Sequence, residues 1–167
     1  MREVSILFGA ERLTLRVPAR ADILTGPDIP RLEDPQAAVL AALQQPIASP
    51  SLRELAEKQR PASVVITMSD ITRPVPNELL ITAILAELHA AGVDDDACTI
   101  LIATGMHRPS TPREREIMLG TDLLRRCRVV DHEAGKQDSL VSISEDPPVS
   151  INRIYADAEL KIVTGLI

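Results

Sequence analysis

SVVITMSDITRPVP (residues 63–76) passes from a short apolar run, rich in β-branched residues, into a polar segment with two prolines. The apolar part, residues 63–68, predicts a buried strand. Good helix formers follow at residues 77–91, and Gly92 stands where a helix C-terminal cap belongs. A second apolar run, residues 99–103, predicts another buried strand. The order strand, helix, strand predicts a βαβ unit with parallel strands and a right-handed crossover.

The sequence before this unit indicates a hairpin, a connecting loop and two short helices. Two alternating segments flank Gly9-Ala10-Glu11, which is typical of a β-hairpin. A segment with four prolines and one glycine then predicts a loop, and Asp34 and Ser51 are placed to cap two helices. The predicted strands are residues 4–8 and 13–17, the loop is 18–35, and the helices are 36–45 and 52–59.

The sequence after this unit indicates one more helix and three more strands. Thr111-Pro112-Arg113-Glu114 combines a capping box with proline at the first helical position, and Gly120 is placed to end the helix before a further turn. The candidate strands are residues 128–131, 140–144 and 160–164. The predicted fold class is therefore α/β, with an open, mainly parallel sheet, flanking helices, βαβ crossovers and an N-terminal β-hairpin.

Composition excludes several classes of protein. The 167 residues are 45% hydrophobic and 25% charged, as in an ordinary globular domain. The net charge is −6 and the only aromatic residues are Phe8 and Tyr155, so nucleic acid is not an expected partner. No apolar run approaches the ~20 residues of a membrane helix, and we expect a soluble cytoplasmic protein without a membrane partner. Cys98 and Cys127 have no metal or redox spacing and are predicted to be buried free thiols.

A polar segment follows each strand of the βαβ unit, and ligands of open parallel sheets bind at that edge. If the two strands are neighbours, Asp70, Thr72 and Arg73 face His107 and Arg108 across one crevice. A guanidinium can hold a carboxylate with two parallel hydrogen bonds, and a histidine can move a proton near neutral pH. This set suits a small anionic substrate, such as a hydroxy acid, from which a proton is removed.

Simpler interpretations remain open for the same residues. Asp70 can merely cap the following turn while Arg73 pairs with it, and His107 can be an ordinary loop histidine. His132 is interpreted as a structural or supporting residue, and His89 as part of a solvated helix face. The three histidines have no recognised metal spacing, so no metal site is predicted within this chain. The glycine-rich phosphate loops of common nucleotide-binding proteins are absent from the sequence.

The two polar segments, in this order, resemble motifs of the lactate racemase family, whose members use a nickel-pincer nucleotide cofactor. SDITRPVP (69–76) is similar to the family's S-D-x-T-R-P-x-P motif, and ATGMHRPST (103–111) is similar to its A-T-G-x-H-R motif. Weaker similarity is found in VDHE (130–133), where Glu133 stands in place of a more typical aspartate, and in residues 149–167. The resemblance covers essentially the whole sequence. It implies that residues 1–167 are the N-terminal domain of a lactate-racemase-like protein.

The resemblance implies a role for each motif residue. His107 corresponds to one of two catalytic histidines that take and return the proton of the substrate hydroxyl, while a hydride moves reversibly between the α-carbon and the cofactor. Arg73 corresponds to the residue that binds the substrate carboxylate, and Arg108 has a supporting role. The implied substrate contacts are Arg73, Asp70, Thr72 and Arg108, and the implied cofactor contacts are Asp70, Thr72 and Gly105.

The family's second catalytic histidine, the lysine that carries the cofactor and a nickel-ligating histidine all follow a T-G-x-I element, and this sequence stops at that element, at Ile167. We therefore expect the N-terminal lobe of a 2-hydroxy-acid racemase or epimerase, without its C-terminal domain, and inactive by itself. The expected partners are a small hydroxy acid and that missing domain, and the cofactor is expected only in the full-length protein. The alternative is a non-catalytic module that binds a small anion or a nucleotide. The motifs do not identify the hydroxy acid.

Overall fold

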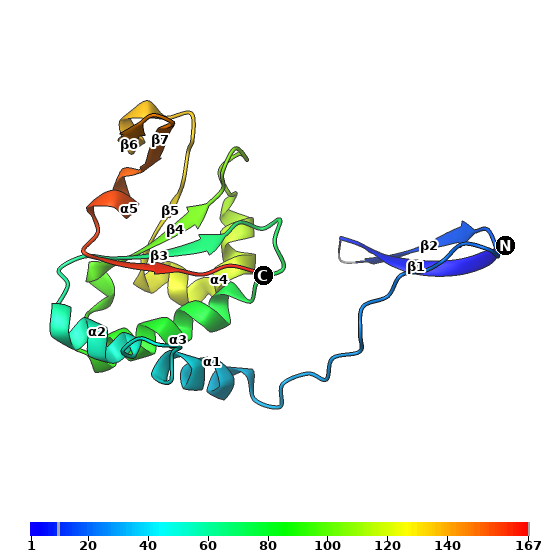
Figure 1. Ribbon diagram of the computed structural model, residues 1–167, viewed down its shortest axis with the longest axis horizontal. Helices are drawn as coiled ribbons and strands as arrows, with labels where there is room; N and C mark the ends of the chain where they lie inside the picture. The colour runs from blue at the N-terminus through cyan, green and yellow to red at the C-terminus, as the bar shows by residue number, and fades with distance from the viewer. Residues whose placement is uncertain (10, 167) are drawn as a thin grey trace. The chain divides into compact units, whose positions relative to one another are not determined.

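The computed structural model describes residues 1–9 and 11–166, and the chain divides into two compact units, Met1–Leu32 and Glu33–Ile167. The first unit contains the antiparallel hairpin β1 (Arg2–Phe8) and β2 (Glu11–Val17) (Figure 1). Alternate residues share a face, so Val4 and Ile6 lie opposite Leu15 and Leu13. Gly9 adopts φ +61°, as the predicted turn requires. The predicted hairpin is confirmed; Ala10 lies outside the described residues.

The second unit is built around a four-stranded, fully parallel sheet with the order β5-β4-β3-β8 (Figure 1). After β3 the chain adds β4 and then β5 on one side of β3, and it later returns to place β8 on the other side. The predicted open, mainly parallel α/β sheet is confirmed. The strands are β3 (Val64–Ser69), β4 (Cys98–Ala103), β5 (Arg128–Asp131) and β8 (Leu160–Val163).

Three helices begin where the capping residues predict, and a short fifth helix, which was not predicted, begins after Asn152. Asp34 caps the first helix, and Ser51 and Thr111 form the two predicted capping boxes. Gly120, at φ +69°, interrupts α4, and a Cβ at this position would collide with the carboxylate of Glu78. The helices are α1 (Pro35–Gln44), α2 (Leu52–Gln59), α3 (Asn77–Ala90), α4 (Pro112–Arg126) and α5 (Arg153–Asp157), with 3₁₀ turns η1 (Asp95–Ala97) and η2 (Gln137–Ser139).

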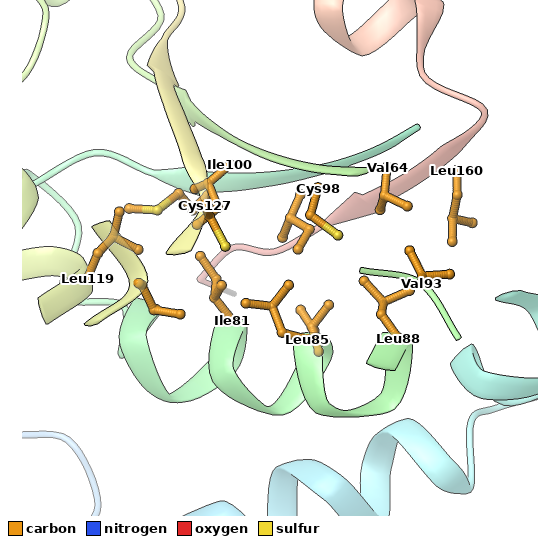
Figure 2. Close-up of a cluster of buried hydrophobic side chains, with 14 of the residues drawn as sticks. Val64, Ile81, Leu85, Leu88, Val93, Cys98, Ile100, Leu119, Cys127 and Leu160 are labelled. Carbon is orange, nitrogen blue, oxygen red and sulfur yellow. The ribbon is translucent and has the colours of Figure 1, made fainter. Parts of the chain in front are cut away.

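The main hydrophobic core lies between the sheet and α3 (Figure 2). Ile81, Leu85 and Leu88 project from α3 toward the strands, where they meet side chains such as Val64 and Ile100. Cys98 and Cys127 belong to this core as free thiols, as predicted. Burial raises the pKa of the Cys98 thiol to about 12 and that of the Cys127 thiol to about 11, so both remain protonated near neutral pH.

A buried carboxylate ties the outer helices to α3. Glu87 is 2% exposed, and it accepts hydrogen bonds from Gln44 of α1 (3.0 Å) and from Arg53 of α2 (3.1 and 3.2 Å). Because the Glu87 carboxylate is buried, removal of Arg53 would leave its charge unpaired and would lower the stability of the folded protein. α1 and α2 therefore form an outer layer on α3, below the sheet as drawn in Figure 1.

Residues 140–144, expected to be one more strand, do form a strand, but it does not join the parallel sheet. β6 (Leu140–Glu145) pairs antiparallel with β7 (Pro148–Asn152), which was not predicted. Pro148 is the first residue of β7, a position at which a strand tolerates proline. Among the described residues, no helix has the length and apolar character required to cross a lipid bilayer.

Candidate functional site

The site lies where β3 and β4 end side by side in the sheet. The register pairs Ser69 with Ala103, so the chain leaves the sheet at one level through Asp70 and Thr104. The loop after β3 is held close to the sheet, because the Asn77 side chain, at the start of α3, donates to the Ser69 carbonyl (3.3 Å). The juxtaposition expected for neighbouring parallel strands is therefore present.

The loop after β4 turns sharply at Gly105. This residue has φ +59°, in the left-handed region that favours glycine. The His107 amide donates to the Thr104 carbonyl at 3.0 Å, and the Thr104 hydroxyl donates to the carbonyl of His132. The turn directs the His107 side chain back toward the loop of β3.

Asp70 and His107 form the centre of the site. Nδ1 of His107 lies 2.5 Å from Oδ2 of Asp70, whose side chain is only 9% exposed. The other carboxylate oxygen accepts the Thr72 hydroxyl at 2.6 Å and the Thr72 amide at 3.2 Å. Both oxygens of a nearly buried carboxylate are thus hydrogen-bonded, as burial of a charge demands.

The electrostatics of Asp70 determine the state of the histidine. Burial by itself raises the pKa of the Asp70 carboxyl, but the hydrogen bonds from Thr72 and His107 outweigh it and hold that pKa below its ordinary value. An ionised carboxylate can only accept, so Nδ1 of His107 must carry a proton. In the neutral imidazole Nε2 is then unprotonated and can accept a proton from a ligand.

Arg73 and His107 line the same pocket, of about 260 Å³. Within the described part of the chain, the Arg73 guanidinium makes no hydrogen bond or ion pair, and its residue is exposed. A free cation beside a proton acceptor can bind a carboxylate and present a neighbouring hydroxyl to the imidazole. The pocket is lined by Ser69, Asp70, Thr72, Arg73, Ala103, Thr104, Gly105, Met106 and His107.

Arg108 is engaged within the protein. Its guanidinium donates two hydrogen bonds to the Glu114 carboxylate, at 2.8 and 2.7 Å, and one to the Pro109 carbonyl at 3.0 Å. The Arg108 guanidinium, followed by the Thr111 amide, lowers the pKa of the Glu114 carboxyl to about 2. Arg108 lies on the wall of a second pocket of about 290 Å³ that also contacts Asp70 and His107.

Sequence reasoning did not identify Asp131 as part of this edge. Its buried carboxylate accepts the Ser110 amide at 3.2 Å and pairs with the Arg115 guanidinium, which links the end of β5 to the loop of His107 and to α4. The strand-end rule that selected Asp70 applies equally to Asp131, because β5 neighbours β4. Its residue type and place were therefore sufficient to find it.

The other two histidines lie in different surroundings. Nδ1 of His132 is 3.2 Å from the Asn152 amide nitrogen, a contact between the end of β5 and the cap of α5. His89 lies on an exposed helix face, as predicted, but Nε2 also contacts Asp95 at 2.6 Å, which was not predicted. Neither histidine lines the pocket that holds Arg73.

The described residues do not fit a nickel site. No three histidine, cysteine, aspartate or glutamate side chains converge within residues 1–9 and 11–166 in a way that could hold a metal ion. The only histidine in the pocket of Arg73 has one ring nitrogen occupied by Asp70. The donor set of this chain suits an organic anion and a proton transfer, and no metal ligation is assigned to it.

Comparison with known proteins identifies the family. The family model described as Lactate racemase N-terminal domain matches residues 8–167. The chain is 36% identical over 135 residues to the lactate racemase of Lactiplantibacillus plantarum, which covers 79% of this chain and 31% of that protein. It is 33% identical over 132 residues to the lactate racemase of Thermoanaerobacterium thermosaccharolyticum, which covers 77% of this chain and 30% of that protein.

Solved structures agree with this result. The lactate racemase apoprotein from Thermoanaerobacterium thermosaccharolyticum superposes with a TM-score of 0.75 at 26% identity, over 97% of this chain and 38% of that one. A Thermotoga maritima protein superposes with a TM-score of 0.57 at 20% identity, over 77% of this chain and 32% of that one, and supports the fold alone. The chain spans about 30% of the length of the curated relatives it matches. By the family model and by both curated relatives, the chain belongs to the lactate racemase N-terminal domain family.

Proposed function

We propose that this chain is the substrate- and cofactor-binding lobe of a nickel-pincer-nucleotide-dependent 2-hydroxy-acid racemase or epimerase. The observation that carries the proposal is the pair formed by Asp70 and His107, which shares one pocket with the unengaged guanidinium of Arg73. Membership of the lactate racemase N-terminal domain family supports it independently.

His107 acts as the general base and acid toward the substrate hydroxyl. Nε2 takes the hydroxyl proton and later returns it, while Asp70 accepts the Nδ1–H and stabilises the imidazolium that forms. Thr72 contributes by binding the second oxygen of the Asp70 carboxylate, which keeps that carboxylate fixed and ionised. The bound cofactor supplies a reversible hydride acceptor for the α-carbon.

Arg73 positions the substrate. Two parallel hydrogen bonds from the guanidinium to the substrate carboxylate fix its orientation, so that the adjacent hydroxyl faces His107. Gly105 is the proposed point of contact with the cofactor, because it lines the same pocket as Arg73 and His107. In this proposal the nickel ligands and the partner domain lie in the part of the curated relatives' length that this chain does not span.

A racemisation assay tests the proposal. The complete gene product is co-expressed with cofactor-making enzymes, its loading is checked by intact mass, and a panel of enantiopure 2-hydroxy acids is followed by chiral chromatography. We expect at least one acid to racemise, and the His107→Gln variant to lose that activity while His89→Gln retains it. If no acid racemises although the loading is complete, the proposal is wrong.

A non-catalytic anion-binding module is the competing function, because Arg73 offers an unengaged cation within the described part of the chain. Calorimetric titration of the chain with lactate, malate and phosphate measures this directly. Binding of phosphate as tight as that of the hydroxy acids, with no racemisation by the loaded protein, would favour the module.

A further inference from the structure

We propose that the ion pair of Arg108 and Glu114 is a clamp that orients His107, so that Arg108 is a positioning residue and does not bind the substrate. The effect on turnover rests on the proposed function; the effect on the imidazole does not. The clamp is defined here as the Arg108 guanidinium, the Glu114 carboxylate and the hydrogen bonds that join them.

The geometry of the clamp is bidentate. Nη1 and Nη2 of Arg108 lie 2.8 and 2.7 Å from the two oxygens of Glu114, and Nη1 also donates to the Pro109 carbonyl. A guanidinium in this arrangement has its fork filled by one carboxylate. A substrate carboxylate would have to displace Glu114 before it could form the same two bonds.

Glu114 has a second function that makes the clamp effective. Its Oε2 accepts the Thr111 amide at 2.8 Å, and its own amide donates to the Thr111 hydroxyl at 3.2 Å, which completes the capping box of α4. One carboxylate thus joins the residue next to His107 to the first turn of a helix. The helix start is rigid, with Pro112 at its first position.

His107 needs such support because it has little packing of its own. Its side chain is 58% exposed, and its described hydrogen-bond partner is Asp70. The loop is anchored at both ends, by the Thr104 hydroxyl on the His132 carbonyl and by the Ser110 amide on Asp131. The clamp lies between these anchors in the chain, at the residue that follows His107, and it lines the same pocket as the imidazole.

The clamp stays charged over the pH range in which a histidine works. The Arg108 guanidinium lowers the pKa of Glu114 to about 2, and the Glu114 carboxylate raises the pKa of Arg108. Asp70, Thr72 and His107 line the same pocket of about 290 Å³ as the clamp, and the Asp70 carboxylate adds to the rise in the pKa of Arg108. The clamp therefore forms a fixed wall beside the reactive pair.

Imidazole ¹⁵N NMR of the chain tests the clamp without any activity. Glu114→Gln keeps an oxygen that can accept the Thr111 amide, and Arg108→Gln leaves the helix start intact; Glu116→Gln, which breaks the exposed Arg113–Glu116 pair, is the matched control. We expect the fraction of the Nε2–H tautomer of His107 to rise about 3- to 10-fold in both clamp variants. The control should not change it, and circular dichroism should report folded protein throughout.

Kinetics of the loaded full-length protein separate positioning from substrate binding. We expect kcat of Arg108→Gln to fall about 10-fold with KM within about 2-fold, and Arg108→Lys to recover part of the loss. A rise in KM at unchanged kcat, or an unaltered tautomer ratio in both clamp variants, would overturn the proposal. Absence of racemisation by the unsubstituted protein would reject the proposed function and leave the NMR result to decide on the clamp.

Discussion

Two histidine–aspartate pairs occur among the described residues, and they differ in what else the aspartate binds. Nδ1 of His107 lies 2.5 Å from Asp70, and Nε2 of His89 lies 2.6 Å from Asp95. The first pair connects two loops at the carboxyl edge of the sheet, whereas the second connects α3 to the turn η1. Distance and residue type alone do not distinguish them.

The pair at the end of α3 includes an arginine. Arg126 donates to Asp95 at 2.9 and 3.4 Å and also reaches Asp122. This hydrogen bond is the largest influence on the pKa of Asp95, which lies below its ordinary value; burial opposes it and His89 adds to it. The guanidinium neutralises the carboxylate, and the cluster ties the ends of two helices together.

The pair at the strand ends leaves its arginine free. The neutral donors of Thr72 satisfy one oxygen of Asp70, and His107 satisfies the other. Arg73 therefore remains in the pocket, without an ion pair to the described residues, where a ligand can reach it. The two pairs thus differ in their arginine: Arg126 neutralises Asp95, whereas Arg73 does not bind Asp70 and lines the pocket beside it.

The largest expected difference concerns turnover. Asp70→Asn should lower kcat of the loaded full-length protein by roughly 10²- to 10⁴-fold, because the imidazole loses the acceptor that sets its tautomer. Asp95→Asn should change kcat by no more than about 2-fold. Racemisation by the two variants is compared at equal cofactor content; equal losses would show that both aspartates serve the fold.

Substitution of Arg73 and substitution of Arg126 should have different effects on the affinity for substrate. Arg73→Gln should raise the KM for the hydroxy acid about 10- to 100-fold, because it removes charge-assisted hydrogen bonds to the carboxylate. Arg126→Gln should leave KM within about 2-fold and lower thermal stability instead. Initial rates over a range of substrate concentrations provide the measurement, and an unchanged KM for Arg73→Gln would remove this residue from the site.

The smallest expected effect is on stability, and it depends on pH. The folded-state pKa of Asp95 is lowered, so the stability it contributes is present above the ordinary carboxyl pKa of about 3.9 and is lost as the pH falls through the lowered value. Asp95→Asn should cost about 1 kcal/mol of unfolding free energy at pH 7, a modest figure because the side chain is 23% exposed. Urea denaturation at pH 7 and at pH 3 should show the difference between this variant and the unsubstituted chain shrinking at pH 3.

Much of the fold was predictable because its determinants are local. Capping residues at positions 34, 51 and 111 and the apolar runs of β3 and β4 indicate the elements directly. The place of β8 beside β3 depends on contacts between segments about 95 residues apart, whereas the hairpin of β6 and β7 is local but was not predicted. No local periodicity encodes the pairing of β8 with β3.

The candidate site was predictable to the same degree. Parallel neighbours deliver their following residues to one edge, which is sufficient to bring Asp70 near His107. The engagement of Arg108 by Glu114 was missed, because the capping box explained Glu114 without it. The contact of His89 with Asp95 was missed because the turn that follows α3 sets it.

Long-range ¹H–¹⁵N NMR of the His107 imidazole in the unsubstituted chain is the most direct measurement of the central claim. In the neutral ring, we expect Nδ1 to carry the proton and Nε2 to resonate as an unprotonated nitrogen, and we expect this pattern to be lost in Asp70→Asn. A ring protonated on Nε2, or one that averages both tautomers equally in the unsubstituted chain, would contradict it.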